Sequence, residues 1–438
     1  MYMSQLPFPQ PTHDSGNYAP PLNPYPPPPP GYQLASYTPP ADYAEPRGYS
    51  TDNYVPPPSL VLPPSYGEAV EPAIVLYRNT MIHNPKFSGG QLQRYTAIDA
   101  DIDAILACSK SNSKSRPKGA DSRIAALIKT LTQLGPLKME VVVQEFHTHP
   151  NNQKGSILRQ FIEDETTGDV QGALFGLIRG PLKYDASRVH YAIKSLPIKE
   201  KILHEIFLEL TPQELSLLAY VYQQMHKTQM LAHWHKHDVS DENWRLYKAV
   251  MHPQRRVLPT QAQNYDARLL MDDVQALHKM QEYTSKEKEK AFTEIFTGRT
   301  REHLIQVCRT YREKHNKAMS QVIRSSFLGD YRSALLFIVA GCDEDPRHPE
   351  TDPQAIRDAK RIEETMVGMG TNKELLAMRV LRAHWSRSRM DRVIAAFPLC
   401  NEKHLQLADR VKGEKGGVLS TQGFQDFKLL ISALLWDM

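Results

Sequence analysis

An Asp-Ala pair recurs four times along the chain, at Asp103-Ala104, Asp185-Ala186, Asp266-Ala267 and Asp358-Ala359. Successive pairs lie about 80 to 90 residues apart, and each starts a stretch whose apolar residues repeat with the period of a helix. This spacing is much longer than that of two-helix solenoid repeats, so each unit must hold several helices. The repetition therefore predicts four small helical bundles of similar structure.

The interior of the second unit supports a purely helical fold. Ile202, Ile206 and Leu210 mark one amphipathic face. The segment Thr211-Pro212-Gln213-Glu214 then combines an N-cap residue, a proline at the first helical position and a capping-box glutamate. Because alternation with a period of two residues is nearly absent, the sequence predicts an all-α fold.

The segment before about Glu71 has a different composition. It holds about twenty of the 33 prolines, together with regularly scattered tyrosines and few aliphatic residues. Such a chain cannot bury enough apolar surface to offset the entropy lost on ordering, and proline runs favour extended polyproline II. We expect residues 1–90 to form a disordered tail.

Two short motifs in the tail have the form Pro-Pro-x-Tyr. One contains Pro29, Pro30 and Tyr32, and the other contains Pro63, Pro64 and Tyr66. WW-type domains bind such ligands in aromatic grooves, so these motifs are candidate contacts for protein partners. A tail rich in proline and tyrosine also produces such matches by chance, and this alternative stays open.

The overall composition limits the classes of function. The net charge of the 438-residue chain is +4, which is too mild for the concentrated basic surface that nucleic acids require. The four cysteines lie far apart and form no Cys-x-x-Cys pair, as is typical of reduced cytosolic proteins. We expect no signal peptide, no transmembrane segment and only peripheral contact with membranes.

Several motifs in the repeats resemble the annexin family. The fourth unit joins Asp358-Ala359 to residues 366–374, Met-Val-Gly-Met-Gly-Thr-Asn-Lys-Glu, which is similar to the annexin pattern Met-x-Gly-x-Gly-Thr-Asp-Glu. Residues 165–169 and 326–331 match the ends of annexin repeats, and residues 297–300 match a pattern in their middle. These motifs occur in the expected order over roughly residues 95–436.

The resemblance implies four five-helix repeats packed into a curved disc. The boundaries that we expect are 95–178 for repeat 1, 181–252 for repeat 2, 262–340 for repeat 3 and 354–436 for repeat 4. It also implies calcium-dependent binding to acidic phospholipids, including phosphatidylserine. We find no nucleophile motif, phosphate-binding loop or pair of catalytic carboxylates, so we expect no enzymatic activity.

Repeat 4 carries the best candidate Ca²⁺ site. Calcium prefers several oxygen ligands, and a glycine-rich turn can direct backbone carbonyls toward one point. Met366, Gly368 and Gly370 occupy those positions, and Thr371 is expected to cap the next helix with Glu374 as its capping-box partner. The resemblance implies an acid from a later loop, for which Glu414 is the first candidate and Asp409 the reserve.

The other three repeats match the calcium pattern less well. In repeat 1 the turn is lengthened and basic, but Gly119 and Glu165 stand where a glycine and the acid are expected. Repeat 2 has no glycine in the corresponding loop, and repeat 3 has Ser326 in place of the acid. We expect a weaker site in repeat 1 and none in repeats 2 and 3.

Two functions remain open on this basis. The first is a cytoplasmic protein that binds acidic phospholipid membranes when calcium rises. The second is an annexin-fold scaffold that has largely lost calcium binding and acts through its proline-rich tail and protein partners.

Overall fold

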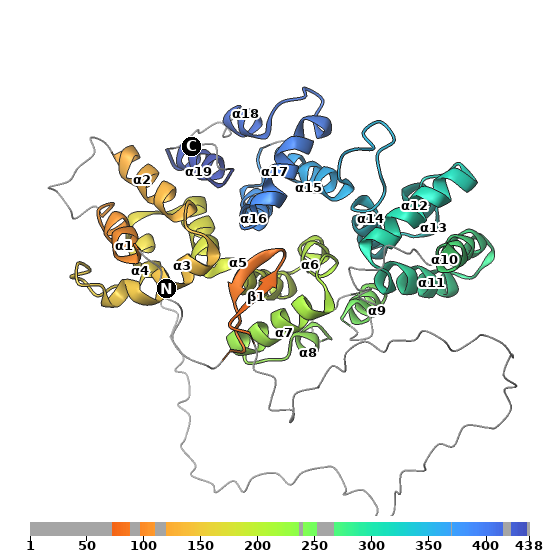
Figure 1. The fold of residues 1–438 in the computed structure, drawn as a ribbon, viewed down its shortest axis with the longest axis horizontal. Coiled ribbons are helices and arrows are strands. Elements are labelled where there is room, and N and C mark those ends of the chain that lie inside the picture. The colour runs from red at the N-terminus through yellow and green to blue at the C-terminus, as the bar shows by residue number, and fades with distance from the viewer. Residues whose placement is uncertain are drawn as a thin grey trace, which may run out of the picture. The chain divides into compact units, whose positions relative to one another are not determined.

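The computed structural model describes residues 72–87, 97–109, 120–235, 240–251, 267–368, 370–414 and 422–435. All of them belong to one compact unit, residues 67–438. The described part is helical apart from a single β-hairpin (Figure 1). The two Pro-Pro-x-Tyr motifs lie outside the described residues.

Repeats 1 and 2 each contain five helices. One long helical segment, α5, serves both repeats, because Gly180 breaks it with a φ of 72° between the last helix of repeat 1 and the first of repeat 2. The elements are α1 (Ile98–Leu106), α2 (Ala120–Thr132), α3 (Pro136–Glu145) with a 3₁₀ turn (Phe146–Thr148), α4 (Leu158–Glu165), α5 (Gly168–Lys194), α6 (Glu200–Phe207), α7 (Pro212–His226), α8 (Met230–His235) and α9 (Asp241–Val250).

Repeats 3 and 4 have the same order of five helices. They consist of α10 (Ala267–Lys279) with a 3₁₀ turn (Met280–Glu282), α11 (Ser285–Gly298), α12 (Arg301–His315), α13 (Met319–Ser326), α14 (Gly329–Ala340), α15 (Pro353–Glu364), α16 (Lys373–His384), α17 (Arg387–Ala396) with a 3₁₀ turn (Phe397–Cys400), α18 (Leu407–Lys412) and α19 (Gln422–Leu434). The prediction of four five-helix repeats is confirmed.

The capping box predicted at the start of α7 is present. The Glu214 backbone N–H donates to the Thr211 hydroxyl at 3.3 Å, and the Thr211 backbone N–H donates to the Glu214 carboxylate at 2.8 Å. Glu214 also accepts the Arg78 backbone N–H at 2.6 Å. One side chain therefore both starts α7 and holds the segment that precedes repeat 1.

Three of the four Asp-Ala pairs lie inside helices and do not start them, which corrects our prediction for those repeats. Asp103, Asp185 and Asp358 lie inside α1, α5 and α15, while Asp266 precedes α10 and lies outside the described residues. Their recurrence reflects side-chain contacts. Asp185 is fully buried, where it accepts from Arg382 Nε at 3.0 Å and from the Tyr77 hydroxyl at 2.9 Å.

Residues that we assigned to the tail form a hairpin, of strands β1 (Ile74–Tyr77) and β2 (Thr80–His83). Arg78 and Asn79 connect the strands with φ of 53° and 59°, as in the tight turns that match the twist of two strands. Tyr77 and Ile82 are buried, whereas Leu76 and Met81 are exposed. This short alternation between buried and exposed residues is the sequence signal of the two strands, and our prediction of a tail up to residue 90 overlooked it.

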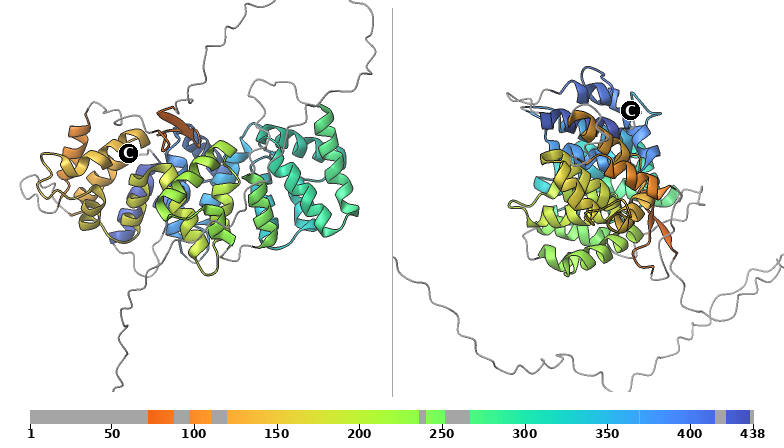
Figure 2. Two further views of the ribbon diagram at one scale, coloured as in Figure 1. Left: turned by 90° about the horizontal axis from the view of Figure 1, so that it is seen from below. Right: turned by 90° about the vertical axis from the view of Figure 1, so that its left-hand side faces the viewer.

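Contacts between helices of different repeats join the bundles. Helix α2 of repeat 1 packs against α19 of repeat 4, α16 of repeat 4 packs against α5, and α9 of repeat 2 packs against α11 of repeat 3. Figures 1 and 2 show the four bundles side by side, with the hairpin on one side of the helical layer. The loops that carry the candidate calcium ligands connect these packed helices.

We predict that Asp185→Asn lowers the free energy of unfolding by about 3 kcal/mol. The substitution removes the charge that compensates Arg382, whose side chain is only 5 % exposed, and an uncompensated buried charge is strongly destabilising. Urea denaturation of the two proteins, followed by circular dichroism, measures the difference.

Asp391→Asn is the matched control. Asp391 pairs with Arg387 on the surface, with side chains 53 % and 62 % exposed, and such pairs contribute less than about 1 kcal/mol. Equally small effects of both substitutions would contradict the stabilising role that we assign to Asp185.

Candidate functional site

The loop between α15 and α16 has the backbone conformation that its glycines predict. Gly368 and Gly370 have φ of 99° and 100°, values that other residues rarely adopt. Met366 is buried and Val367 is 63 % exposed, while Met369 lies outside the described residues. The loop thus turns sharply at the two glycines that the sequence singles out as carriers of ligand carbonyls.

The cap of α16 differs from our prediction. Asn372 is the N-cap, because its side chain accepts the Leu375 backbone N–H at 3.1 Å. Thr371 instead donates its hydroxyl hydrogen bond to Glu414. Glu374, the expected capping-box partner, accepts from Arg188 at 2.8 Å and from the Tyr191 hydroxyl at 3.2 Å. Thr371 therefore orients Glu414, the candidate ligand, and does not cap α16.

Glu414 lies against the glycine loop. It follows α18, and its side chain reaches Thr371 across 43 positions of sequence. The reserve candidate Asp409 is exposed, and its backbone carbonyl accepts the Gly413 N–H at 2.9 Å, which shapes the end of α18. The geometry thus favours Glu414 over Asp409 as the carboxylate of this site.

A guanidinium group also occupies this site. Arg410 Nη2 donates to the Met366 carbonyl at 2.6 Å, Nη1 donates to the Glu414 carboxylate, and Nε donates to the Glu363 carboxylate at 3.1 Å. Burial lowers the pKa of Arg410, but its hydrogen bonds to Glu414 and Glu363 outweigh burial and raise the pKa above the ordinary value. The site therefore already contains a permanent cation.

The chemical groups of this site suit calcium, but some of them already form hydrogen bonds within the site. The loop offers backbone carbonyls, and Glu414 offers a carboxylate, which are the oxygen ligands that Ca²⁺ prefers. Two of those groups, the Met366 carbonyl and Glu414, are hydrogen-bonded to Arg410. The site predicted from the sequence did not include Arg410, which lies in α18 only four residues before Glu414.

In repeat 1, only part of the weaker candidate site is described. Gly119 lies outside the described residues. Glu165 is buried at the end of α4 and accepts the Ser109 hydroxyl at 3.1 Å. It lines a cleft of about 430 Å³ together with Asp103 and Asp164. The expected acid thus lies beside the turn that follows α1.

The corresponding loops of repeats 2 and 3 have other structures. In repeat 2, Leu196 is 96 % exposed at the tip of a loop without glycine. In repeat 3, Thr284 and Glu287 form a capping box at the start of α11, and Ser326 ends α13. Among the residues that the structure describes, no cluster of three or more His, Cys, Asp or Glu side chains could hold a metal ion.

Comparisons with known proteins agree with this architecture. The annexin family model matches residues 272–338. Annexin C1 of Cryptococcus neoformans var. grubii is 27 % identical over 318 residues, which cover 73 % of this chain and 64 % of that protein. Mouse annexin A4 is 26 % identical over 60 % of this chain and 78 % of its own length. The chain belongs to the annexin family.

Solved annexin structures show the same fold. A point mutant of annexin A8 with an intact N-terminus aligns over 80 % of this chain and 97 % of its own, with a TM-score of 0.63 and 19 % identity. Calcium-bound annexin (Sm)1 aligns over 79 % of this chain and 92 % of its own, with a TM-score of 0.60 and 18 % identity. The helical repeats described above are therefore annexin repeats.

We predict that Arg410→Met increases the affinity of repeat 4 for calcium about tenfold or more. The substitution removes a cation from the site and releases two oxygen groups, and relief of about 1.4 kcal/mol is enough for a tenfold change. Isothermal titration calorimetry with calcium chloride measures this effect.

Arg387→Met serves as the control, because Arg387 is exposed and pairs with Asp391 within α17. Its calcium affinity should equal that of the wild type. If Arg410→Met also leaves the affinity unchanged, the guanidinium does not compete with calcium.

Proposed function

We propose that this chain binds acidic phospholipid membranes in a calcium-dependent manner, as a cytoplasmic protein that associates peripherally when calcium rises. Membership of the annexin family supports the general activity. The observation that supports assigning this activity to particular residues is the glycine loop of repeat 4, against which Glu414 is packed. Met366, Gly368, Gly370 and Glu414 are the proposed ligands, and Gly119 with Glu165 are weaker candidates in repeat 1.

Each part of the site has a distinct role in this proposal. Gly368 and Gly370 allow the backbone turn, Glu414 contributes negative charge, and Thr371 holds that carboxylate toward the loop. A calcium ion bound there would offer open coordination positions to a lipid phosphate oxygen. Arg410 must first leave the Met366 carbonyl and Glu414, so binding requires a local rearrangement.

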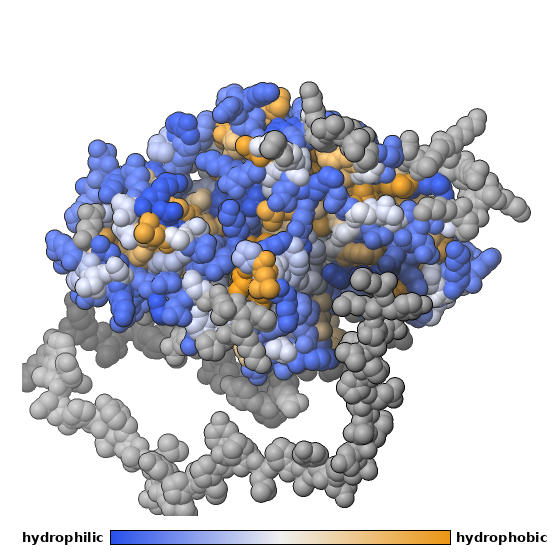
Figure 3. Space-filling view, turned by 180° about the vertical axis from the view of Figure 1, so that it is seen from behind, coloured by the Kyte–Doolittle hydropathy of each residue, from blue (hydrophilic) through white to orange (hydrophobic). Residues whose placement is uncertain are grey.

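Exposed apolar residues near this loop fit contact with lipid. Val367 is 63 % exposed and Leu196 is 96 % exposed. The two loops lie next to each other. Glu374, at the start of α16, accepts a hydrogen bond from the Tyr191 hydroxyl and lies 3.4 Å from Lys199 Nζ. Tyr191 and Lys199 precede and follow Leu196 in the chain. Figure 3 shows a mostly hydrophilic surface with small apolar patches on the side opposite to Figure 1. Small apolar tips beside charged side chains suit the interface of a bilayer.

The contact is proposed to be peripheral. Within the described ranges, no helix combines the length and the apolar character needed to cross a bilayer. The charge of the chain, +4 overall, adds a mild attraction to anionic lipid.

Arg410 favours a second candidate function. A site whose ligands are already paired with a resident cation suits an annexin-fold scaffold that has largely lost calcium binding. Such a protein would act through its proline-rich tail and protein partners.

Vesicle co-sedimentation distinguishes the two functions. We predict that the full chain sediments with phosphatidylserine-containing vesicles in calcium and not in EGTA. Glu414→Gln should weaken this calcium-dependent binding roughly tenfold, because the charge of the ligands sets calcium affinity. Asp409→Asn, on the exposed reserve acid, should bind like the wild type.

Other outcomes of the vesicle experiment would contradict either the calcium-dependent function or the assignment of Glu414 as a ligand. Equal sedimentation in calcium and EGTA, or none in either, would exclude the calcium-dependent function and favour the scaffold. Calcium-dependent binding that survives Glu414→Gln would show that another acid holds the ion.

A further inference from the structure

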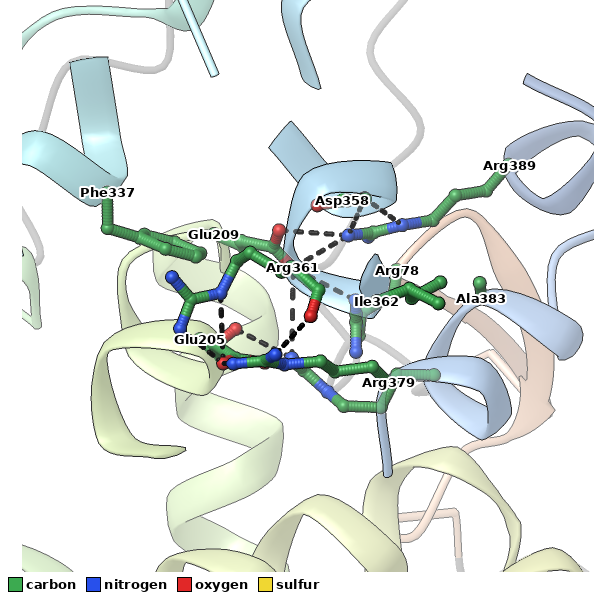
Figure 4. A pocket seen from close by; sticks show the side chains of 11 residues that line it. Arg78, Glu205, Glu209, Phe337, Asp358, Arg361, Ile362, Arg379, Ala383 and Arg389 are labelled. Atoms are coloured by element: carbon green, nitrogen blue, oxygen red, sulfur yellow. Dashed lines mark hydrogen bonds and ion pairs between the residues drawn. The ribbon is translucent and has the colours of Figure 1, made fainter. Parts of the chain in front are cut away.

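Ten charged side chains form a buried cluster where the hairpin meets repeats 2 and 4. We call it the central ion cluster, and each of its members is at most 19 % exposed. Figure 4 shows most of these side chains converging from separate helices. The members are the arginines Arg78, Arg357, Arg361, Arg379, Arg382 and Arg389 and the acids Asp185, Glu205, Glu209 and Asp358.

The arginines of the cluster outnumber its acids by two. Two further acids lie at the edge of the cluster and compensate its excess positive charge only in part. Glu364 is 61 % exposed, and its Oε2 lies 3.8 Å from Arg379 Nη1. Glu214 accepts the backbone N–H of Arg78 instead of a guanidinium. Because like charges repel strongly where water is excluded, this excess of buried positive charge is unfavourable unless an anion offsets it.

Arg78 is the least satisfied member of the cluster. Its Nη2 donates to Glu209 at 2.9 Å, and its Nη1 lies 3.7 Å from Asp185, beyond hydrogen-bond distance. Within the described part of the chain, Arg78 Nε and Nη1 are buried without a hydrogen-bond acceptor. Burial, together with the charges of Arg382 and Arg389, lowers the pKa of Arg78 to about 10. A guanidinium whose side chain is only 5 % exposed thus has two donor atoms to spare.

Arg78 also lines a small cavity. Its volume is about 20 Å³. Its lining consists of five arginines, three acids and three apolar residues, namely Arg78, Arg361, Arg379, Arg382, Arg389, Glu205, Glu209, Asp358, Phe337, Ile362 and Ala383. A space of roughly this size holds one water molecule or one monatomic ion. Phosphate, with five heavy atoms, does not fit. Because the five arginines of this lining outnumber its three acids, the position favours an anion over a cation.

We propose that this cavity binds one monatomic anion, chloride under ordinary conditions, held by the unpaired N–H groups of Arg78. An anion satisfies the donors and reduces the excess positive charge at the same time, whereas a water molecule satisfies the donors alone. Arg78 belongs to the turn of the hairpin, and its other contacts lead to Glu209 and Glu214 of repeat 2. Bound chloride would therefore strengthen the attachment of the hairpin to the helical repeats.

The first test measures thermal unfolding of the full chain in sodium chloride, sodium bromide and sodium gluconate at equal ionic strength. Gluconate is too large for the cavity, so the wild type should unfold at a higher temperature in either halide, by a few degrees. Arg78→Lys keeps a positive charge near Glu209 but removes the spare donors, and it should show no difference between the salts. Arg347→Met, a change at an arginine that is 78 % exposed, should respond like the wild type.

The second test locates the ion. Crystals of the full chain in sodium bromide should show an anomalous difference peak within hydrogen-bond distance of Arg78 Nε or Nη1. A peak without any halide effect on unfolding would identify an adventitious ion only, which overturns the proposal. Equal unfolding temperatures of the wild type in all three salts, or density that fits water alone, would overturn it as well.

Discussion

The attachment of the hairpin and the contact between repeats 2 and 4 depend on a buried network of charges. Asp185 in α5 binds Arg382 in α16, and Glu205 in α6 binds Arg361 and Arg379 of repeat 4. Burial of each ion would be prohibitive alone, so these helices must meet in the register that pairs them. Glu209 extends the same network to the hairpin through Arg78. The network thus specifies how segments far apart in sequence fit together.

The sequence predicted those parts of the fold that local patterns determine. Helical periodicity and capping residues such as Thr211 and Glu214 act over a few positions, and the four bundles follow from them. The structural role of the Asp-Ala pairs could not be predicted from such local patterns. Asp185 and Asp358 recur because they face arginines of α16 and α17, and a single sequence does not show which helices will meet.

The hairpin and the repeat 4 site illustrate the same limit. Strands of only four residues leave too little alternation to stand out beside a proline-rich segment. The burial of Tyr77, whose hydroxyl donates to Asp185, depends on a helix more than one hundred positions away. At the candidate site, Gly368 and Gly370 have the positive φ that the conformational preference of glycine predicts. The exchange of roles between Thr371 and Asn372 arises from Glu414, which lies more than forty positions away. Conformational preferences of single residues thus predict the backbone of this loop, whereas contacts between distant segments determine the hydrogen-bond partners of its side chains.

Arg410 links these observations to the proposed function. In a disc with several equivalent calcium sites, avidity allows each site to be weak, because the sites bind one membrane together. Here repeats 2 and 3 lack the expected loops, so repeat 4 contributes most of the proposed calcium-dependent affinity. A resident guanidinium neutralises Glu414 and Glu363 without calcium. Under the proposed function, the free energy that this pairing contributes to the loop would be subtracted from calcium binding. Under the proposed function, the threshold for membrane binding would be set by the competition between one arginine and one ion for the same oxygen atoms.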